Sequence, residues 1–245
     1  MAGRAVKAVL FDLDNTLIET SKAGGAALQK TSELLKTKLS LDDDSVLNIC
    51  EKFKQKLLHE RYDPSSGSMD DLRVRHWEES IVETLGSCSP SSLAAQCYFL
   101  WKNSRLEALC LSPEVRCLLT QLRSRYKLLL LTNGEARTQR EKVEAARCEE
   151  FFDAVVVGGE HPEQKPFLSV FRLCFNMLDV DPQDCVMVGD SLDTDIQGGF
   201  NAGVRATVWI SAAEGSDLEG PVKPDYTIPT VLQLPDILAQ LQEQQ

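Results

Sequence analysis

Long apolar runs are missing from this sequence, and their absence argues against a membrane protein. No apolar stretch reaches the roughly 20 residues that a membrane-spanning helix needs. The apolar stretch at residues 5–11 is followed directly by Asp12 and is too short for the hydrophobic region and cleavage site of a signal peptide. We therefore expect a cytoplasmic protein that has no membrane partner.

An excess of positive charge is also missing. The chain has 26 Lys and Arg residues against 37 Asp and Glu residues, which gives a formal net charge of -11. Because nucleic acids and anionic membranes are bound by basic patches, we expect neither as a partner. An anionic substrate would need a local group of cationic side chains.

The spacing Cys-x-x-Cys, which is typical of redox and zinc sites, does not occur among the eight cysteines. Most of them have apolar neighbours, where a cysteine behaves as a small hydrophobic residue. We therefore predict that all are reduced and that they contribute to the core. They are Cys50, Cys88, Cys97, Cys110, Cys117, Cys148, Cys174 and Cys185.

What the sequence does contain is a series of short apolar, β-branched runs separated by helical patterns. This order is typical of a parallel α/β sheet with helices packed on it. The expected strands are residues 5–13, 127–131, 154–157 and 185–188, with a weaker fifth at 206–210. The expected helices are residues 113–125, 135–147 and 166–178, a fourth that Gly203 ends, and 231–242. We predict a Rossmann-like core.

The region between the first strand and Pro113 contains no strand-like run, and it is too long for an ordinary connection between a strand and a helix. Helical patterns occupy residues 24–39, 42–61, 69–85 and 93–109. We therefore predict a helical cap at residues 19–110, inserted into an α/β core of residues 1–18 and 111–245.

Two acidic residues, Asp12 and Asp14, follow the first buried strand. Residues two apart in an extended chain point the same way, so both carboxylates should face one place. Acids in such a position are costly unless a cation compensates them. The alternative is that one of them only caps a turn.

A second acidic segment follows the strand at 185–188, where Asp190 comes directly after Gly189. Open α/β sheets bind ligands at the carboxyl ends of their strands. If the two strands are neighbours, Asp12 and Asp190 supply oxygen ligands for Mg²⁺ from opposite sides. Asp195 either supports that site or is an ordinary acid at the start of a helix.

Two further strand ends carry groups suited to phosphate. Thr132 and Asn133 precede a glycine that leaves backbone N–H groups exposed, and Lys165 adds a positive charge. Taken alone, Thr132 and Asn133 before a glycine indicate only a loop, and Lys165 could simply be a solvated lysine. Together, the four strand ends would provide a nucleophile, a hydrogen-bond donor for phosphate, a cation and a metal ligand.

These motifs resemble the four motifs of the haloacid dehalogenase-like superfamily over the whole chain. They are Asp-x-Asp-x-Thr at residues 12–16, the strand-terminal Thr132, Lys165-Pro166, and Gly189-Asp190 with a later aspartate. Residues 10–18, 76–79, 97–102 and 152–160 closely resemble one member, a phosphatase that acts on a phosphorylated nine-carbon sugar acid.

The resemblance implies a magnesium-dependent phosphatase that forms a phospho-aspartate. Asp12 would be the nucleophile and Asp14 the acid and then the base. Mg²⁺ would be held by Asp12, the backbone carbonyl of Asp14, and Asp190. Phosphate binding is assigned by the resemblance to Leu13, Asp14, Thr132, Asn133 and Lys165. The expected partner is a small phosphorylated sugar acid.

The sequence is compatible with several alternatives. The same chemistry could act on another small phosphate such as phosphoglycolate, or in a phosphohexose mutase. A dehalogenase has no use for an acid at Asp14, and a non-catalytic binding protein should have lost one of the catalytic groups. For the carboxylate of a sugar acid, the predicted cap offers Arg73, Arg75, His76, Lys102 and Arg105.

Overall fold

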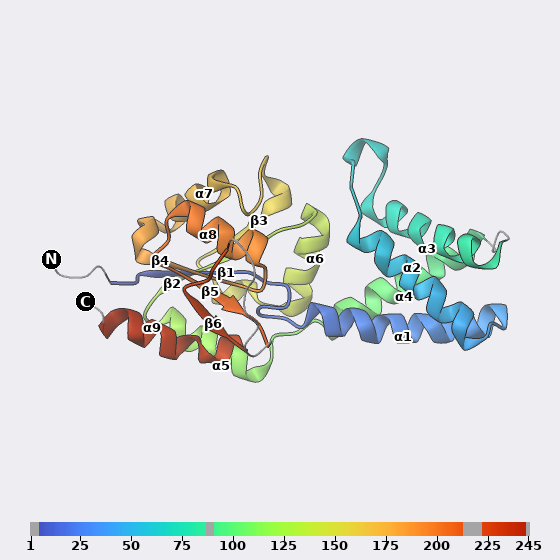
Figure 1. The fold of residues 1–245 in the computed structure, drawn as a ribbon, viewed down its shortest axis with the longest axis horizontal. Coiled ribbons are helices and arrows are strands. Elements are labelled where there is room, and N and C mark those ends of the chain that lie inside the picture. The colour runs from blue at the N-terminus through green and yellow to red at the C-terminus, as the bar shows by residue number, and fades with distance from the viewer. Residues whose placement is uncertain (1–4, 87–90, 213–221, 244–245) are drawn as a thin grey trace. The chain divides into compact units, whose positions relative to one another are not determined.

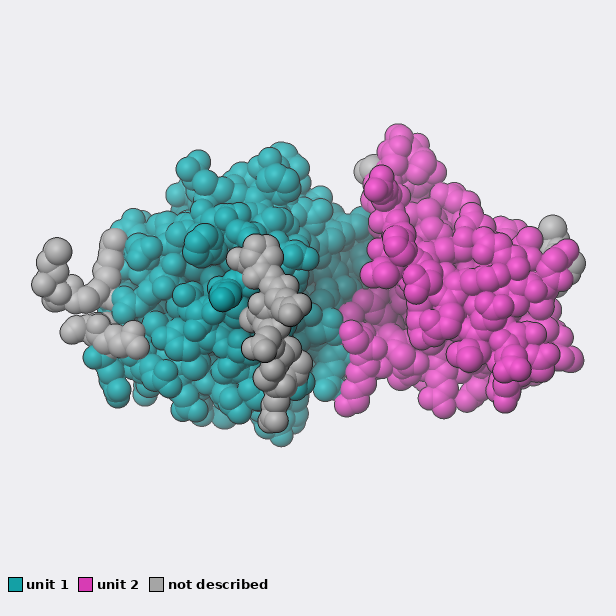
Figure 2. All heavy atoms as spheres, viewed as in Figure 1, with its two compact units in different colours: residues 1–19, 110–245 teal, residues 20–109 magenta. Residues whose placement is uncertain are grey.

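The structure is a computed structural model that describes residues 5–86, 91–212 and 222–243. The chain divides into two compact units, coloured separately in Figure 2. The α/β unit comprises Met1–Glu19 and Cys110–Gln245, and the helical unit comprises Thr20–Leu109. These bounds differ slightly from those expected from the sequence.

The α/β unit contains a sheet of six parallel strands in the order β3-β2-β1-β4-β5-β6 (Figure 1). The strands are β1 (Ala8–Phe11), β2 (Lys127–Thr132), β3 (Ala154–Val157), β4 (Cys185–Gly189), β5 (Ala206–Ile210) and β6 (Tyr226–Ile228). The predicted parallel α/β core is confirmed, including the weaker fifth strand. The sixth, of three residues, was not predicted.

Strand β1 lies in the middle of this sheet and pairs with both β2 and β4. Phe11, its last residue, is in register with Leu130 and Val188. All four residues of β1 are buried, as expected of a strand covered on both faces. The residues that follow β1, β2 and β4 therefore come together at one edge, which we call the carboxyl edge.

In the described part of the α/β unit, five α-helices accompany the sheet. They are α5 (Pro113–Arg123), α6 (Ala136–Ala146), α7 (Leu168–Leu178), α8 (Gln197–Ala202) and α9 (Leu234–Glu243). Helices α7 and α8 lie on one face of the sheet, and α5 and α9 lie on the other (Figure 1). Shorter helical turns occur at Glu149–Phe151, Gly158–Glu160, Pro182–Asp184, Leu192–Ile196 and Val231–Gln233. Gly203 ends α8 in the left-handed conformation, as predicted.

The helical unit consists of α1 (Thr20–Leu39), α2 (Asp43–Leu58), α3 (Met69–Leu85) and α4 (Ser91–Ala108), with a short turn at Pro64–Ser66. Ser68 caps α3 through a reciprocal pair of hydrogen bonds with Asp71. The core of the unit contains an aromatic cluster among aliphatic residues: Phe53 stacks on Trp77 at 4.0 Å between ring centroids and meets Trp101 edge-on.

Within the described ranges, no helix is both long and apolar enough to cross a membrane. The described cysteines are free thiols, in agreement with the predicted reduced state. Cys110 and Cys117 are exposed, however, so the prediction that they belong to the core is wrong. Cys88 lies outside the described residues.

Candidate functional site

A buried lysine joins two aspartates at the carboxyl edge. The Nζ atom of Lys165 lies 2.6 Å from Oδ1 of Asp12 and 2.7 Å from Oδ1 of Asp195, and it donates to the carbonyl of Leu131 at 2.7 Å. The exposed fraction is 6% for Asp12, 3% for Lys165 and 1% for Asp195. Since an unpaired charge at this depth is strongly unfavourable, the three groups depend on one another.

The glycine of the Gly189-Asp190 motif makes this arrangement possible. A Cβ atom on Gly189 would lie only 2.2 Å from Oδ2 of Asp195, so any side chain would displace that carboxylate. The same oxygen accepts a hydrogen bond from the backbone N–H of Ser191 at 3.0 Å. Asp195 is therefore a buried partner of Lys165, and it does not act as an exposed acid at the start of a helix.

Three carboxylates converge at the carboxyl edge. One oxygen from each of Asp12, Asp190 and Asp195 lies within 4.8 Å of the others. Asp190 is held by a hydrogen bond from the side-chain amide of Asn15 at 3.4 Å, and its carbonyl accepts the indole N–H of Trp209 at 2.8 Å. Hard oxygen donors in a small group are the ligands that Mg²⁺ prefers, so the residues fit this ion.

The pKa values of these groups reflect burial and the short distances between the carboxylates. Burial raises the pKa of Asp12 to about 6, and the charges of Asp195 and Asp14 add to the rise while Lys165 opposes it. Burial and then the charge of Asp12 also raise the pKa of Asp190. Burial alone would lower the pKa of Lys165, but the carboxylates of Asp12 and Asp195 raise it. A bound cation would relieve the repulsion among the carboxylates.

Asp14 contacts different partners from Asp12. Its carboxylate accepts hydrogen bonds from Lys142 at 2.7 and 2.9 Å and from the side-chain amide of Gln139 at 2.9 Å. Both donors belong to α6. Asp12 and Asp14 thus have different hydrogen-bond partners, although the charge of Asp14 still helps to raise the pKa of Asp12. Neither α6 residue was predicted from the sequence.

The residues expected to bind phosphate lie beside these groups. Thr132, 1% exposed, ends β2 and accepts a hydrogen bond from Gln139 at 2.6 Å. The side chain of Asn133 donates to the carbonyl of Lys165 at 2.8 Å and accepts its N–H at 3.0 Å. Asn133 therefore supports Lys165 with its side chain. The side chain of Leu13 is fully buried, so Leu13 can serve a phosphate only through its backbone.

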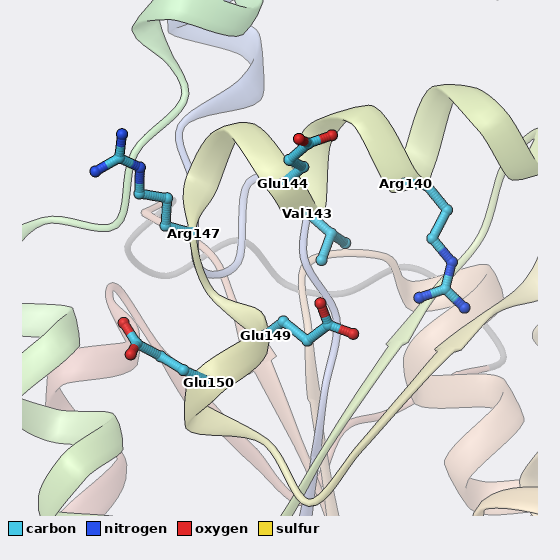
Figure 3. A pocket seen from close by; sticks show the side chains of 6 residues that line it. All are labelled: Arg140, Val143, Glu144, Arg147, Glu149 and Glu150. Atoms are coloured by element: carbon cyan, nitrogen blue, oxygen red, sulfur yellow. The ribbon is translucent and has the colours of Figure 1, made fainter.

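A pocket of 860 Å³ near the end of α6 includes none of these residues (Figure 3). It is lined by Arg140, Val143, Glu144, Arg147, Glu149 and Glu150. Arg140 is engaged by Glu160 through two hydrogen bonds of 2.7 Å. Both positively and negatively charged side chains line this pocket, and we assign it no ligand.

Comparison with known proteins agrees with this geometry. The chain is 49% identical over 233 residues to the human N-acylneuraminate-9-phosphatase, with 95% of this chain and 94% of that protein covered, and 48% identical to the rat protein of the same name over equal shares. The structure resembles that of the HAD-hydrolase YfnB of Bacillus subtilis bound to magnesium, with a TM-score of 0.71 at 21% identity over 96% of this chain and 99% of that chain. The family profile of the haloacid dehalogenase-like hydrolases matches residues 6–203. The chain therefore belongs to the haloacid dehalogenase-like hydrolases.

Proposed function

We propose that the protein is a phosphatase that hydrolyses N-acylneuraminate 9-phosphate to the free sugar acid and phosphate. The observation that carries this proposal is the buried group of Asp12, Lys165 and Asp195 beside Asp190, in a chain 49% identical to the human N-acylneuraminate-9-phosphatase. A carboxylate with a fixed cation beside it can attack an anionic phosphate group, which an isolated carboxylate would repel.

In the first half-reaction, a carboxylate oxygen of Asp12 attacks phosphorus. A bond forms between Asp12 and phosphorus while the bond from phosphorus to the sugar oxygen breaks. Asp14 donates its proton to that oxygen as it leaves. Lys165 supplies fixed positive charge, and the hydroxyl of Thr132 and the backbone amides of Leu13, Asp14 and Asn133 bind the phosphate oxygens.

In the second half-reaction, water attacks the phosphorus of the phospho-aspartate. Asp14, now a carboxylate, removes a proton from the water as the new bond forms. The bond between phosphorus and Asp12 breaks, which releases phosphate and restores both aspartates to their initial state. One residue thus acts first as an acid and then as a base.

Mg²⁺ is the proposed cofactor, and the carboxylates of Asp12 and Asp190 with the backbone carbonyl of Asp14 would hold it. When bound, the ion would neutralise charge on the phosphate oxygens and on the attacking carboxylate. Asp195 belongs to the same group of acids, but one of its oxygens is already paired with Lys165. We assign it the task of holding Lys165 in place.

Magnesium should stabilise the folded protein measurably in the absence of substrate. An ion that binds only the native state at 100 times its dissociation constant contributes about 2.7 kcal/mol. We therefore expect the melting temperature of chelator-treated protein to rise on addition of MgCl₂, and we expect the Asp190→Asn variant to lose most of that rise.

The matched control for this measurement is Asp193→Asn, because Asp193 is an exposed acid in the same segment and lies outside the group of carboxylates. This variant should keep the full shift. Equal shifts in wild type and Asp190→Asn would contradict the proposed metal site.

The sugar acid carries a carboxylate as well as a phosphate, and the helical unit contains a pocket suited to such a group. The pocket has a volume of 640 Å³ and is lined by Thr20, Ser21, Gly24, Gly25, Leu28, Lys54, Leu57, Leu58, Arg73, Trp101 and Arg105. Its charged lining residues are all cationic, although the chain has a net charge of -11. A carboxylate is favoured in this environment.

Two of the cations considered from the sequence, Arg73 and Arg105, line this pocket. Glu60 accepts hydrogen bonds from Arg73 at 2.9 and 3.1 Å. The guanidinium of Arg105 lies 5.2 Å from the centre of the Trp101 ring, in the pocket. A guanidinium held against an aromatic face can still pair with a carboxylate.

Substrate preference tests this proposal. Wild type should show a higher kcat/KM for N-acylneuraminate 9-phosphate than for glucose 6-phosphate or phosphoglycolate. Arg105→Ala should raise KM for the sugar acid about tenfold, because one charge-assisted hydrogen bond contributes about 1.5–3 kcal/mol. KM for glucose 6-phosphate, which has no carboxylate, should stay the same.

The control variant is Arg75→Ala, which removes an exposed arginine of α3 outside the pocket. It should leave both KM values unchanged. A preference of wild type for phosphoglycolate would contradict the proposed substrate, and equal effects of Arg105→Ala on both sugar phosphates would contradict carboxylate binding by Arg105.

A further inference from the structure

Helix α6 presents two polar residues on the side that a helix normally fills with apolar ones. Its buried residues are Gln139, Lys142, Val143 and Ala146, at the spacing of a single helical face. Gln139 is 2% exposed and Lys142 is 6% exposed. Removing a charged amine from water costs several kcal/mol, so its position requires a specific partner.

That partner is Asp14. Lys142 donates to both oxygens of its carboxylate, at 2.7 and 2.9 Å, and Gln139 donates to one of them at 2.9 Å. Three hydrogen bonds from one rigid helix restrict both the rotation and the direction of a side chain that is itself about one-quarter exposed. From these contacts, we infer that Gln139 and Lys142 are positioning residues that orient the Asp14 carboxylate for its proton transfers.

Gln139 also orients Thr132. Its Nε2 atom lies 2.6 Å from the Thr132 hydroxyl oxygen and 2.9 Å from Asp14, so the two N–H bonds serve the two residues. The amide orientation follows from the carboxylate, which would repel the amide oxygen. Because the Thr132 oxygen accepts here, its own proton must point elsewhere, and it remains available to a phosphate oxygen.

The loop after β2 is shaped to admit the Gln139 side chain. Gly134 has a φ of +125°, and a Cβ atom at this position would lie 3.0 Å from Cγ and 3.1 Å from Cδ of Gln139. A larger residue would therefore press on the amide that connects Asp14 with Thr132. The glycine, the glutamine and the lysine form one arrangement that supports two of the proposed site residues.

The inference rests on the proposed role of Asp14, so two variants have to be compared. Asp14→Asn should slow formation of the phosphoenzyme from an alkyl phosphate much more than from p-nitrophenyl phosphate, whose leaving group needs no proton. Lys142→Met should show the same selectivity in a weaker form. We expect the single-turnover rate with the alkyl ester to fall about 100-fold, since a small misplacement can have that effect, with KM within about twofold of wild type.

Three further measurements separate orientation from a loss of folding. Lys142→Arg should recover part of the lost rate, since it restores a cationic donor. Arg137→Met, on the exposed side of the same helix, should match wild type on both esters. The single-turnover rate of phosphoenzyme formation in Lys142→Met should fall more for the alkyl ester than for p-nitrophenyl phosphate, because a loss of folded protein would lower the two rates equally.

The possible failures are distinguishable. If Asp14→Asn slows phosphoenzyme formation from both esters equally, the proposed acid role fails. If Asp14→Asn is selective in this step but Lys142→Met slows it equally for both esters, or for neither, then Lys142 has only a structural role and our inference is overturned.

Discussion

Replacing Asp12 by Asn is expected to abolish turnover while the chain remains folded. Asn has nearly the same shape as Asp but cannot act as the nucleophile, so kcat should fall by more than about 1000-fold. Stability should not decrease, because burial and neighbouring carboxylates already raise the pKa of Asp12 to about 6 and so disfavour its charge in the folded state. Activity and thermal unfolding should be measured on the same preparation.

Asp193→Asn is the matched control for Asp12→Asn, since it removes an exposed carboxylate close in sequence to Asp190 and Asp195. It should retain the activity of wild type. Phosphatase activity in Asp12→Asn above that of a mock purification would exclude the phospho-aspartate mechanism, whatever the substrate.

Replacing Lys165 by Met should have the largest effect on stability. Lys165 is 3% exposed and is the cation between the carboxylates of Asp12 and Asp195. Its loss leaves two buried acids facing one another, and breaking a buried ion pair in this way costs about 3–5 kcal/mol. We expect the free energy of unfolding, measured in urea, to fall by that amount, and turnover to be lost.

A double variant tests the cause of this destabilisation. Lys165→Met with Asp195→Asn removes one of the opposed charges, so it should be more stable than Lys165→Met alone by about 1–3 kcal/mol. Lys36→Met removes one partner of an exposed ion pair with Asp43, and should change stability by less than about 1 kcal/mol. If the double variant were less stable than Lys165→Met, charge repulsion would not be the cause.

The sequence was informative about the fold because the strands are buried on both faces. An apolar, β-branched run such as 185–188 can be identified without its neighbours, and a long stretch without strands indicates an insertion. Strand β6 gave no such signal, since it has three residues. Asp225, which accepts hydrogen bonds of 2.8 Å from the backbone and hydroxyl of Thr207, helps to hold it beside β5.

The candidate site was predictable to the extent that it depends on strand ends. Asp12, Thr132 and Asp190 follow or end neighbouring parallel strands, so topology alone brings them together. Gln139 and Lys142 could not be found in this way, because polar residues on a helix usually face solvent. Only the packing of α6 in the α/β unit distinguishes them from the exposed Arg137 of the same helix.

The pairing partners of the individual carboxylates also could not be predicted from the sequence. The alternation of a strand predicts one direction for Asp12 and Asp14, but β1 ends at Phe11 and the chain turns after it. Asp14 pairs with Lys142 of α6, whereas Asp12 pairs with Lys165. Such a choice depends on partners that are distant in the sequence.

The central position of β1 has a consequence for how the protein is made. β1 is the first strand to be synthesised, yet its partners are β2 and β4, and the adjacent pair Lys7 and Asp184 is 177 positions apart. The helical unit is one continuous segment that can fold while the apolar β1 still lacks both neighbours. Pairing over such separations is slow. Asp12 therefore leaves the ribosome long before its partners in the α/β unit, and the group of carboxylates around it can form only after Asp190 and Asp195 have been synthesised.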